Sequence, residues 1–180
     1  MFGTLIKKRL TDEKVANIFV NAILDVTEKG FEEVAGLIKE DSAFVHQPQI
    51  NVSDNGKFTM IVLAGNLKFL EDHFEADQVA RVEELIFDKF AGVFGISASE
   101  LKQIVKEYDH FMARVNHPSK NTLYAMSKAV FHKYNLNDYQ DDYFRKMQCP
   151  NPLFLKRMDD VMTNFVWDWN AFFKRYKLIA

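Results

Sequence analysis

Glu107 and His110 are the residues whose types and spacing come nearest to a metal-binding motif. They stand three positions apart in a segment of helical periodicity, so a carboxylate oxygen and an imidazole nitrogen can reach one metal ion. A carboxylate-bridged site in a helical bundle needs two such motifs and further glutamates on facing helices. The chain offers one motif, and Glu71-Asp72-His73 has a different internal spacing. We therefore predict an ordinary surface pair, and no metal or cofactor.

The local motifs of nucleophilic and phosphate-transfer catalysis are absent from the sequence. It has no Gly-x-Ser-x-Gly, no glycine-rich phosphate loop, no Cys-x-x-Cys and no His-Glu-x-x-His. Cys149-Pro150 resembles the Cys-Pro pair through which some regulatory proteins bind haem. A cysteine at a helix end before a proline turn is the commoner arrangement, and we adopt that interpretation. The sequence favours a protein that is not an enzyme.

The segment 90–101 resembles the helix-turn-helix pattern of DNA-binding proteins. Ala91, Gly95 and Leu101 stand where that pattern places a small residue, a turn glycine and a core residue. The resemblance implies a regulator that contacts DNA through residues around 79–112, which we keep as an alternative function. Acidic side chains on both expected helices would repel DNA phosphates. The chain has 23 basic and 25 acidic residues, a net charge of −2, so we do not expect nucleic-acid binding.

Composition and periodicity predict an all-α fold. Hydrophobic residues make up 48% of the 180 residues, and 7 Gly and 4 Pro are too few for the turns of a many-stranded protein. We expect one domain over residues 1–180, a compact multi-helix bundle of about seven helices with a Phe-rich core. The helices are expected at 12–30, 31–38, 60–74, 77–91, 98–115, 119–134, from 137 onward, and 152–176.

Glycine, proline and capping residues set the expected boundaries between these helices. Gly30 is placed to end the first helix in a left-handed conformation. Residues 41–57 contain turn chemistry and predict an irregular loop or a small hairpin that pairs 50–52 with 58–60. Ser97 and Glu100 have the spacing of a capping box. Asn151 and Pro152 suit the start of the last helix.

The last helix is expected to be long and unbroken. Its apolar positions recur at spacings of three and four residues; they are Leu155, Met158, Met162, Phe165, Trp169, Phe172 and Tyr176. On such a helix Trp167 lies nearly opposite the apolar stripe. It is then either covered, with the N-terminal helix as the favoured cover, or exposed as an interface anchor. Phe173, Leu178 and Ile179 add apolar surface, so the interface candidates are Trp167, Phe173, Leu178 and Ile179.

The order of residues at the start of the chain predicts a cytoplasmic location. Apolar residues in Met1–Ile6 precede the basic Lys7–Arg9, which is the reverse of a secretory signal. One cysteine cannot form an internal disulfide. The uncharged runs Val15–Leu24 and Phe58–Leu67 are shorter than the ~20 residues that cross a bilayer, so we expect no transmembrane segment.

Taken together, these features predict a non-catalytic cytoplasmic helical domain that acts through protein–protein interaction, with self-association as one form. The main alternative is a bundle that binds a small molecule or cofactor in an apolar pocket among its 17 Phe and 7 Met side chains.

Overall fold

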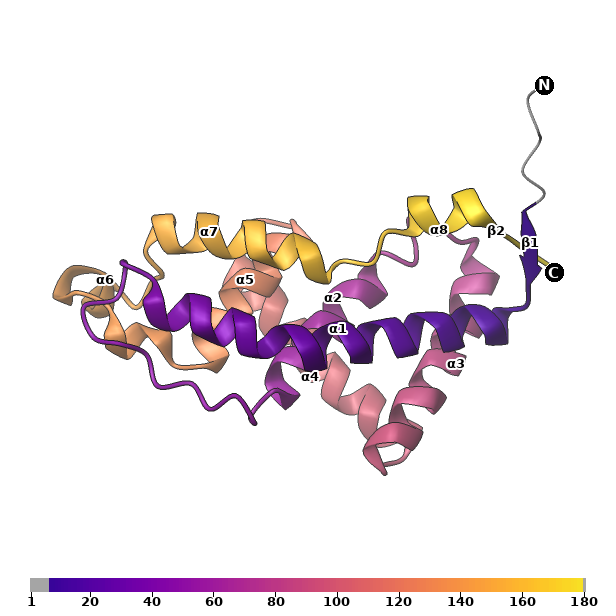
Figure 1. Cartoon of the computed structure of the whole chain (residues 1–180), viewed down its shortest axis with the longest axis horizontal. Coiled ribbons are helices and arrows are strands. Elements are labelled where there is room, and N and C mark those ends of the chain that lie inside the picture. Colours follow the sequence, from indigo (N-terminus) through magenta and orange to yellow (C-terminus); the bar gives the residue numbers. More distant parts are fainter. Residues whose placement is uncertain (1–6, 180) are drawn as a thin grey trace, which may run out of the picture.

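The structure, a computed structural model, describes residues 7–179 and is all-α apart from two short strands (Figure 1). The expected all-α class and bundle-like packing are confirmed. The α-helices of the described residues are α1 (Asp12–Glu40), α2 (Gly56–Lys68), α3 (Ala76–Phe94), α4 (Ala98–Asn116), α5 (Thr122–Lys133), α6 (Asp142–Met147), α7 (Pro152–Met162) and α8 (Trp169–Arg175). Two 3-10 helices, η1 (Leu136–Tyr139) and η2 (Thr163–Phe165), connect them.

Helix α1 runs along most of the molecule and packs against α2 and α3 (Figure 1). It starts at the expected cap, where the Thr11 hydroxyl accepts the Lys14 N–H. The predicted end at Gly30 is wrong, and 31–38 is not a separate helix. The buried stripe of α1 continues through Phe31 and Ile38, so the apolar contacts of one long helix outweigh the cost of an internal glycine.

The loop between α1 and α2 is irregular, as one of the two sequence-based alternatives expected. The hairpin is wrong, because residues 58–60 lie in α2, where nearly every side chain is buried. Asn55 precedes α2 but makes no side-chain capping bond. The Tyr134 hydroxyl from the end of α5 replaces it: it accepts the Phe58 N–H at 3.1 Å and donates to the Asp54 carbonyl at 2.8 Å. Burial raises the pKa of Tyr134, which keeps the phenol protonated.

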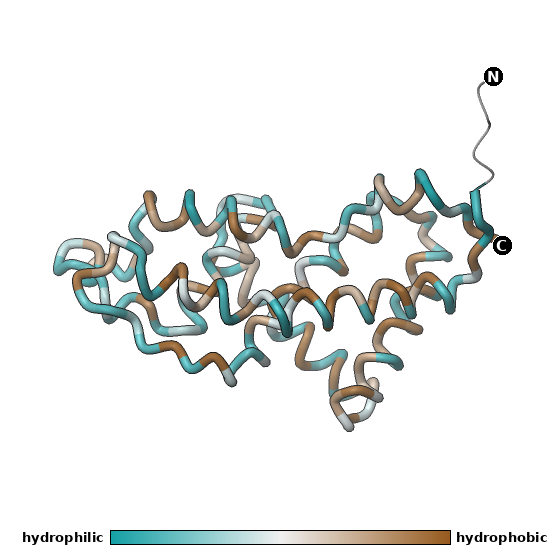
Figure 2. The backbone as a smooth tube through the Cα atoms, viewed as in Figure 1, coloured by the Kyte–Doolittle hydropathy of each residue, from teal (hydrophilic) through white to brown (hydrophobic). Residues whose placement is uncertain are grey.

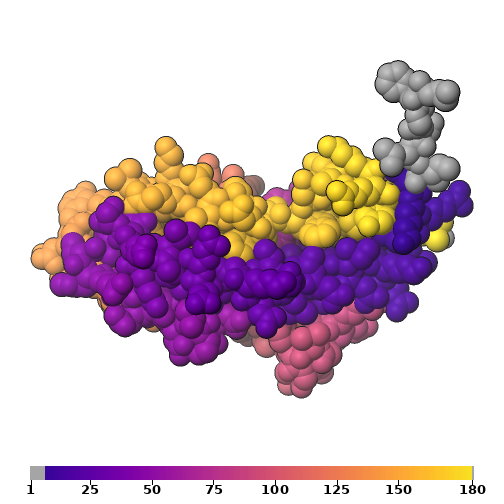
Figure 3. Space-filling view, in the orientation of Figure 1, coloured from indigo at the N-terminus to yellow at the C-terminus, as the bar shows by residue number. Residues whose placement is uncertain are grey.

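Helices α3 and α4 form a corner that projects from the rest of the molecule (Figures 1 and 3). Gly95 ends α3 with a φ of 68°, in the left-handed region that favours glycine. The capping box at the start of α4 is confirmed, with Ser97 and Glu100 bonded in both directions. Local sequence chemistry therefore accounts for this corner.

The long C-terminal helix predicted from the apolar spacing is wrong. Helix α7 ends at Met162 and the single 3-10 turn η2 follows it. Residues 166–168 are not helical, and α8 begins at Trp169. Figure 3 shows a notch between the atoms of α7 and α8 at this break. The apolar spacing predicted one helix because it continues across the break: Phe165 before it and Trp169 and Phe172 after it are all buried.

Asn66 of α2 stabilises the break. Its side chain is 1% exposed, and its Nδ2 donates to the carbonyls of Val62 and Phe165, both at 2.8 Å. Its Oδ1 accepts the Trp167 N–H at 2.8 Å. The amide therefore satisfies backbone groups that a continuous helix would have bonded internally.

A short parallel sheet, which the sequence did not predict, joins the two ends of the described chain. Strand β1 (Lys8–Leu10) pairs with β2 (Tyr176–Leu178), with Lys8 opposite Tyr176 and Leu10 opposite Leu178. The expectation drawn from Met1–Ile6 concerns residues that lie outside the described range. Among residues 7–179, no helix has the length and apolar character needed to cross a membrane.

Hydrophobic and hydrophilic residues alternate along α1 and α3, as Figure 2 shows. The core that their apolar faces enclose is rich in aromatic rings, as expected. The largest fully buried aromatic side chains are Phe19, Phe31, Phe58, Phe90, Phe131, Phe154 and Trp169.

Candidate functional site

The four predicted interface residues lie at one end of the molecule, around α8 and β2. Trp167, Phe173 and Leu178 are half-buried and pack against the core, and Ile179 is 41% exposed. We call this region the C-terminal aromatic surface, and define it by Trp167, Trp169, Phe173, Tyr176, Leu178 and Ile179.

A stack of aromatic rings holds the two tryptophans of this surface in place. Trp169 lies parallel to Phe19 of α1, with centroids 5.7 Å apart, and Phe74 meets it edge-on at 4.9 Å. Trp167 meets the same Phe19 edge-on at 6.3 Å. Offset and edge-to-face contacts of this kind add to the free energy of burial. Helix α1 thus contacts Trp167, as the favoured prediction supposed, while part of the ring remains open to a cavity.

That cavity has a volume of about 390 Å³ and lies where the chain passes from η2 to α8. Its walls include Phe69, Leu123 and the two tryptophans, with His73 at one side. His73 also lines a neighbouring cavity of about 550 Å³, together with Lys7, Phe173, Tyr176, Lys177 and Leu178. The two hollows adjoin at His73 and extend over the C-terminal aromatic surface.

Both indole N–H groups of the site lack an acceptor. The Nε1 atoms of Trp167 and Trp169 are buried and have no hydrogen-bond partner within the part of the chain that the structure describes. Trp169 as a whole is 1% exposed. A buried indole N–H normally finds an acceptor, and leaving one unpaired costs about 1–3 kcal/mol. Two unpaired donors therefore belong to side chains that line the cavity.

Most of the charged side chains on the segments around this surface are basic; Asp168, which lines the cavity between the two tryptophans, is an acidic one. Six basic side chains stand on β1, its leading residue, α8 and β2: Lys7, Lys8, Arg9, Lys174, Arg175 and Lys177. Neither 7–10 nor 169–179 contains an acidic residue. Within residues 7–179 none of the six forms an ion pair. These segments therefore carry an excess of positive charge, although Asp168 lines the cavity itself.

The other residues singled out in the sequence lie elsewhere. Glu107 and His110 are exposed on α4, where Glu107 accepts a hydrogen bond from Gln103 at 3.1 Å. In the described part of the chain, no three His, Cys, Asp or Glu side chains gather closely enough to hold a metal ion. Cys149 is a half-buried free thiol beyond α6. None of these residues belongs to the C-terminal aromatic surface.

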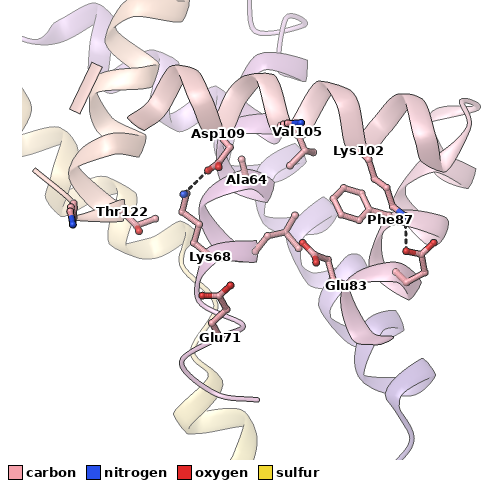
Figure 4. A pocket seen from close by; sticks show the side chains of 13 residues that line it. Ala64, Lys68, Glu71, Glu83, Phe87, Lys102, Val105, Asp109 and Thr122 are labelled. Carbon is pink, nitrogen blue, oxygen red and sulfur yellow. Dashed lines mark hydrogen bonds and ion pairs between the residues drawn. The ribbon is translucent and has the colours of Figure 1, made fainter. Parts of the chain in front are cut away.

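A third cavity, of about 700 Å³, opens between α2, α3, α4 and the start of α5. We call it the charged cleft (Figure 4). Lys68 pairs with Asp109 at 2.6 Å and so joins α2 to α4. Lys102 pairs with Glu84, also at 2.6 Å, and joins α4 to α3. Glu83 faces the space between these two ion pairs (Figure 4).

Glu83 has a raised pKa in the charged cleft. Burial of its carboxyl is the main cause; Lys102 partly opposes the shift, while Glu71 and Glu84 add to it by repulsion. The folded protein therefore holds this proton more tightly than the unfolded chain. The resulting stability is present below the ordinary pKa of 4.5 and is lost as the pH rises through the folded-state pKa.

Replacing Glu83 by glutamine should therefore stabilise the protein at neutral pH and have little effect in acid. The gain is expected to stay below about 1 kcal/mol, because water screens this half-exposed group. Urea unfolding at several pH values measures it. Glu84→Gln is the matched control, since it removes the partner of Lys102 and should give no gain. A Glu83→Gln variant that is less stable at neutral pH would contradict the expectation.

Comparison of the chain with protein family models, with curated proteins and with solved structures finds no match in any of the three. Function is therefore inferred from the geometry of the chain's own residues.

Sequence reasoning missed two residues beside the C-terminal aromatic surface. His73 stands out in the sequence only as part of a cluster with unsuitable metal spacing, whereas in the structure it lines both hollows. Asn66 was not singled out, although an amide inside the apolar run Phe58–Leu67 is a signal of its own. A polar side chain in such a run must find partners once buried, and here those partners shape the site.

Proposed function

We propose that residues 1–180 form a single non-catalytic interaction domain, and that its C-terminal aromatic surface binds an acidic segment of another protein. The observation that carries this proposal is an open cavity lined by Trp167 and Trp169, whose buried indole N–H groups have no acceptor among residues 7–179.

Carboxylates are the acceptors that suit these donors best. Lys7 and Lys177 line the second hollow, and neither forms an ion pair in the described residues, so a negative partner is attracted there. Asp168 lines the first hollow, so the acidic residues of the partner are expected over the second. A hydrogen bond to an ionised acceptor is also about twice as strong as one between neutral groups. Asp and Glu side chains supply such acceptors in a protein segment.

The walls of the cavities favour a segment that also carries an apolar anchor. Phe69, Leu123 and Val166 line the first hollow, and Phe173 and Leu178 the second. Two hollows that adjoin at His73 suit successive side chains of one extended segment. Aromatic anchors in desolvated pockets supply most of the affinity in protein interfaces. The expected partner segment therefore combines acidic residues with an aromatic one.

A model peptide, acetyl-Glu-Glu-Phe-Glu-Glu-amide, tests the proposal by isothermal titration calorimetry on the full chain. We expect binding that weakens as salt is added, because charge attraction contributes to it. Trp167→Phe keeps an aromatic ring against Phe19 and removes one N–H, so it should weaken binding about tenfold or more. The charge reversal Lys177→Glu should also weaken binding, whereas Lys39→Glu at the far end of α1 is the matched control.

Three outcomes would overturn the proposal. The first is equal binding of the neutral peptide with Gln in place of each Glu, since the surface would then not recognise charge. The second is tighter binding of single-stranded DNA than of the peptide. The third is a wild-type dimer in sedimentation velocity that Trp167→Phe dissociates, which would make a second copy of the chain the partner.

A further inference from the structure

The floor of the charged cleft is apolar. It is formed by Ala64 and Leu67 of α2, Phe87 of α3 and Val105 of α4, each less than one tenth exposed. The cleft shares no lining residue with the cavities of the C-terminal aromatic surface. Its volume of about 700 Å³ lies within the range of small-molecule sites. An apolar floor of this kind suits the hydrocarbon part of a bound molecule.

The charges above this floor are only partly matched. The pairs Lys68–Asp109 and Lys102–Glu84 neutralise four of the lining side chains. Glu71, just beyond α2, and Glu83 on α3 remain without an ion-pair partner in residues 7–179. So do two lysines, at positions 106 on α4 and 120 before α5. Unpaired acids and unpaired lysines therefore stand on different elements that line the same cleft.

Glu83 is the group in the cleft that most needs a counter-charge. Its side chain is half-buried beside the apolar floor, and it makes no hydrogen bond or ion pair within the described chain. Lys102 is engaged with Glu84 and with the face of Phe87, 5.7 Å from the ring centroid. The raised pKa of Glu83 agrees with this shortage of cations. An incoming ammonium group would supply the missing charge without displacing either ion pair.

We infer that the charged cleft binds a small amphoteric molecule with an ammonium group at one end and a carboxylate at the other. Its ammonium pairs with Glu83 and Glu71, its carboxylate with Lys106 and Lys120, and its apolar stem covers Leu67, Phe87 and Val105. This is a ligand site separate from the surface proposed for a protein partner.

Three probes of similar length separate the contributions of the two ends. The full chain is titrated with ε-aminocaproate, which carries both charges, and with hexylamine and hexanoate, which carry one each. Binding is followed by NMR through the methyl resonances of Leu67 and Val105, which report on the cleft itself. We expect ε-aminocaproate to bind about tenfold more tightly than either single-ended probe, since each charge-assisted pair adds affinity.

Two variants test which residues bind the ammonium end and the carboxylate end of the ligand. Glu83→Gln should lower the affinity for ε-aminocaproate toward that for hexanoate, and Lys106→Met should lower it toward that for hexylamine. Glu71 and Lys120 still attract each end of the molecule in these variants, so neither loss is expected to be complete. Glu32→Gln and Lys14→Met on the exposed side of α1 are matched controls and should change neither value.

Equal affinity for the three probes would overturn the inference, and so would no shift of the Leu67 and Val105 resonances with any probe. An unchanged affinity in a folded Glu83→Gln variant would also overturn it, because the ammonium would then lie elsewhere.

Discussion

Replacing Asn66 by leucine is expected to lower the free energy of unfolding by about 2–4 kcal/mol, although the two side chains have the same number of heavy atoms and the same branching. Leucine can neither donate to the Phe165 carbonyl nor accept the Trp167 N–H, each 2.8 Å from the asparagine amide. These backbone groups would remain away from water and unbonded, which is costly. Urea unfolding followed by circular dichroism measures the loss.

Asn17→Leu is the matched control for this prediction. Asn17 lies on the exposed side of α1, so the same exchange there removes no buried bond and should change stability by less than about 0.5 kcal/mol. Equal stabilities of the Asn66→Leu and Asn17→Leu variants would show that Asn66 does not hold the break between η2 and α8.

Replacing Gly30 by alanine is expected to destabilise the protein by about 1–3 kcal/mol, even though alanine is the better helix former. A Cβ at position 30 would lie 2.8 Å from two ring carbons of Phe165. That ring is 5% exposed and meets Phe58 edge-on at 4.8 Å, so it cannot move aside without losing other contacts. The overlap therefore outweighs the gain of about 1 kcal/mol from helix propensity.

Gly36→Ala in the same helix should have the opposite sign. No atom lies within 4 Å of a Cβ at that position, so only the propensity gain of about 1 kcal/mol remains. Thermal and urea unfolding of the two variants side by side provide the measurement. A Gly30→Ala variant as stable as Gly36→Ala would mean that the Phe165 ring relaxes freely.

Both predictions concern the same junction of the fold. Phe165 packs on Gly30, its carbonyl is bonded to Asn66, and the next residues enter the cavity of the C-terminal aromatic surface. Trp167 and Trp169 flank the end of this junction, with Asp168 between them capping α8 through the Ala171 N–H. A substitution that made residues 163–169 continue as one helix would therefore be expected to close the proposed binding site as well.

The features that the sequence alone determined are those whose partners lie close in the chain. Thr11 caps α1 through a residue three positions later, and Ser97 and Glu100 complete their box over the same distance. Gly95 ends α3 because it adopts a left-handed φ readily. Apolar spacing likewise predicts which faces are buried, since a helix repeats every 3.6 residues on average. These signals were sufficient for the all-α class and for most helix starts.

The proposed binding site could be predicted only in part from the sequence. The surplus of aromatic and other apolar residues near the C-terminus indicates Trp167, Phe173, Leu178 and Ile179, and the structure places them around α8 and β2 at one end of the molecule (Figure 1). Whether a partner binds there stays a prediction. The unpartnered indole groups and the charged cleft were not visible in the sequence, because both arise where several helices meet.

Tertiary structure alone decided where helices continue and where they break. Gly30 lies inside α1, where the ring of Phe165, far along the chain, packs so closely that it leaves no room for a side chain. The apolar stripe of residues 155–176 is compatible with one helix, yet Asn66 bonds to groups 99 and 101 residues away and holds the chain open there. The pairing of β1 with β2 likewise joins opposite ends of the described chain. The spacing of apolar residues within a segment predicts which side of a helix is buried. A backbone N–H or carbonyl gives up its partner in the same helix for a distant side chain only when tertiary packing brings that side chain within hydrogen-bond distance.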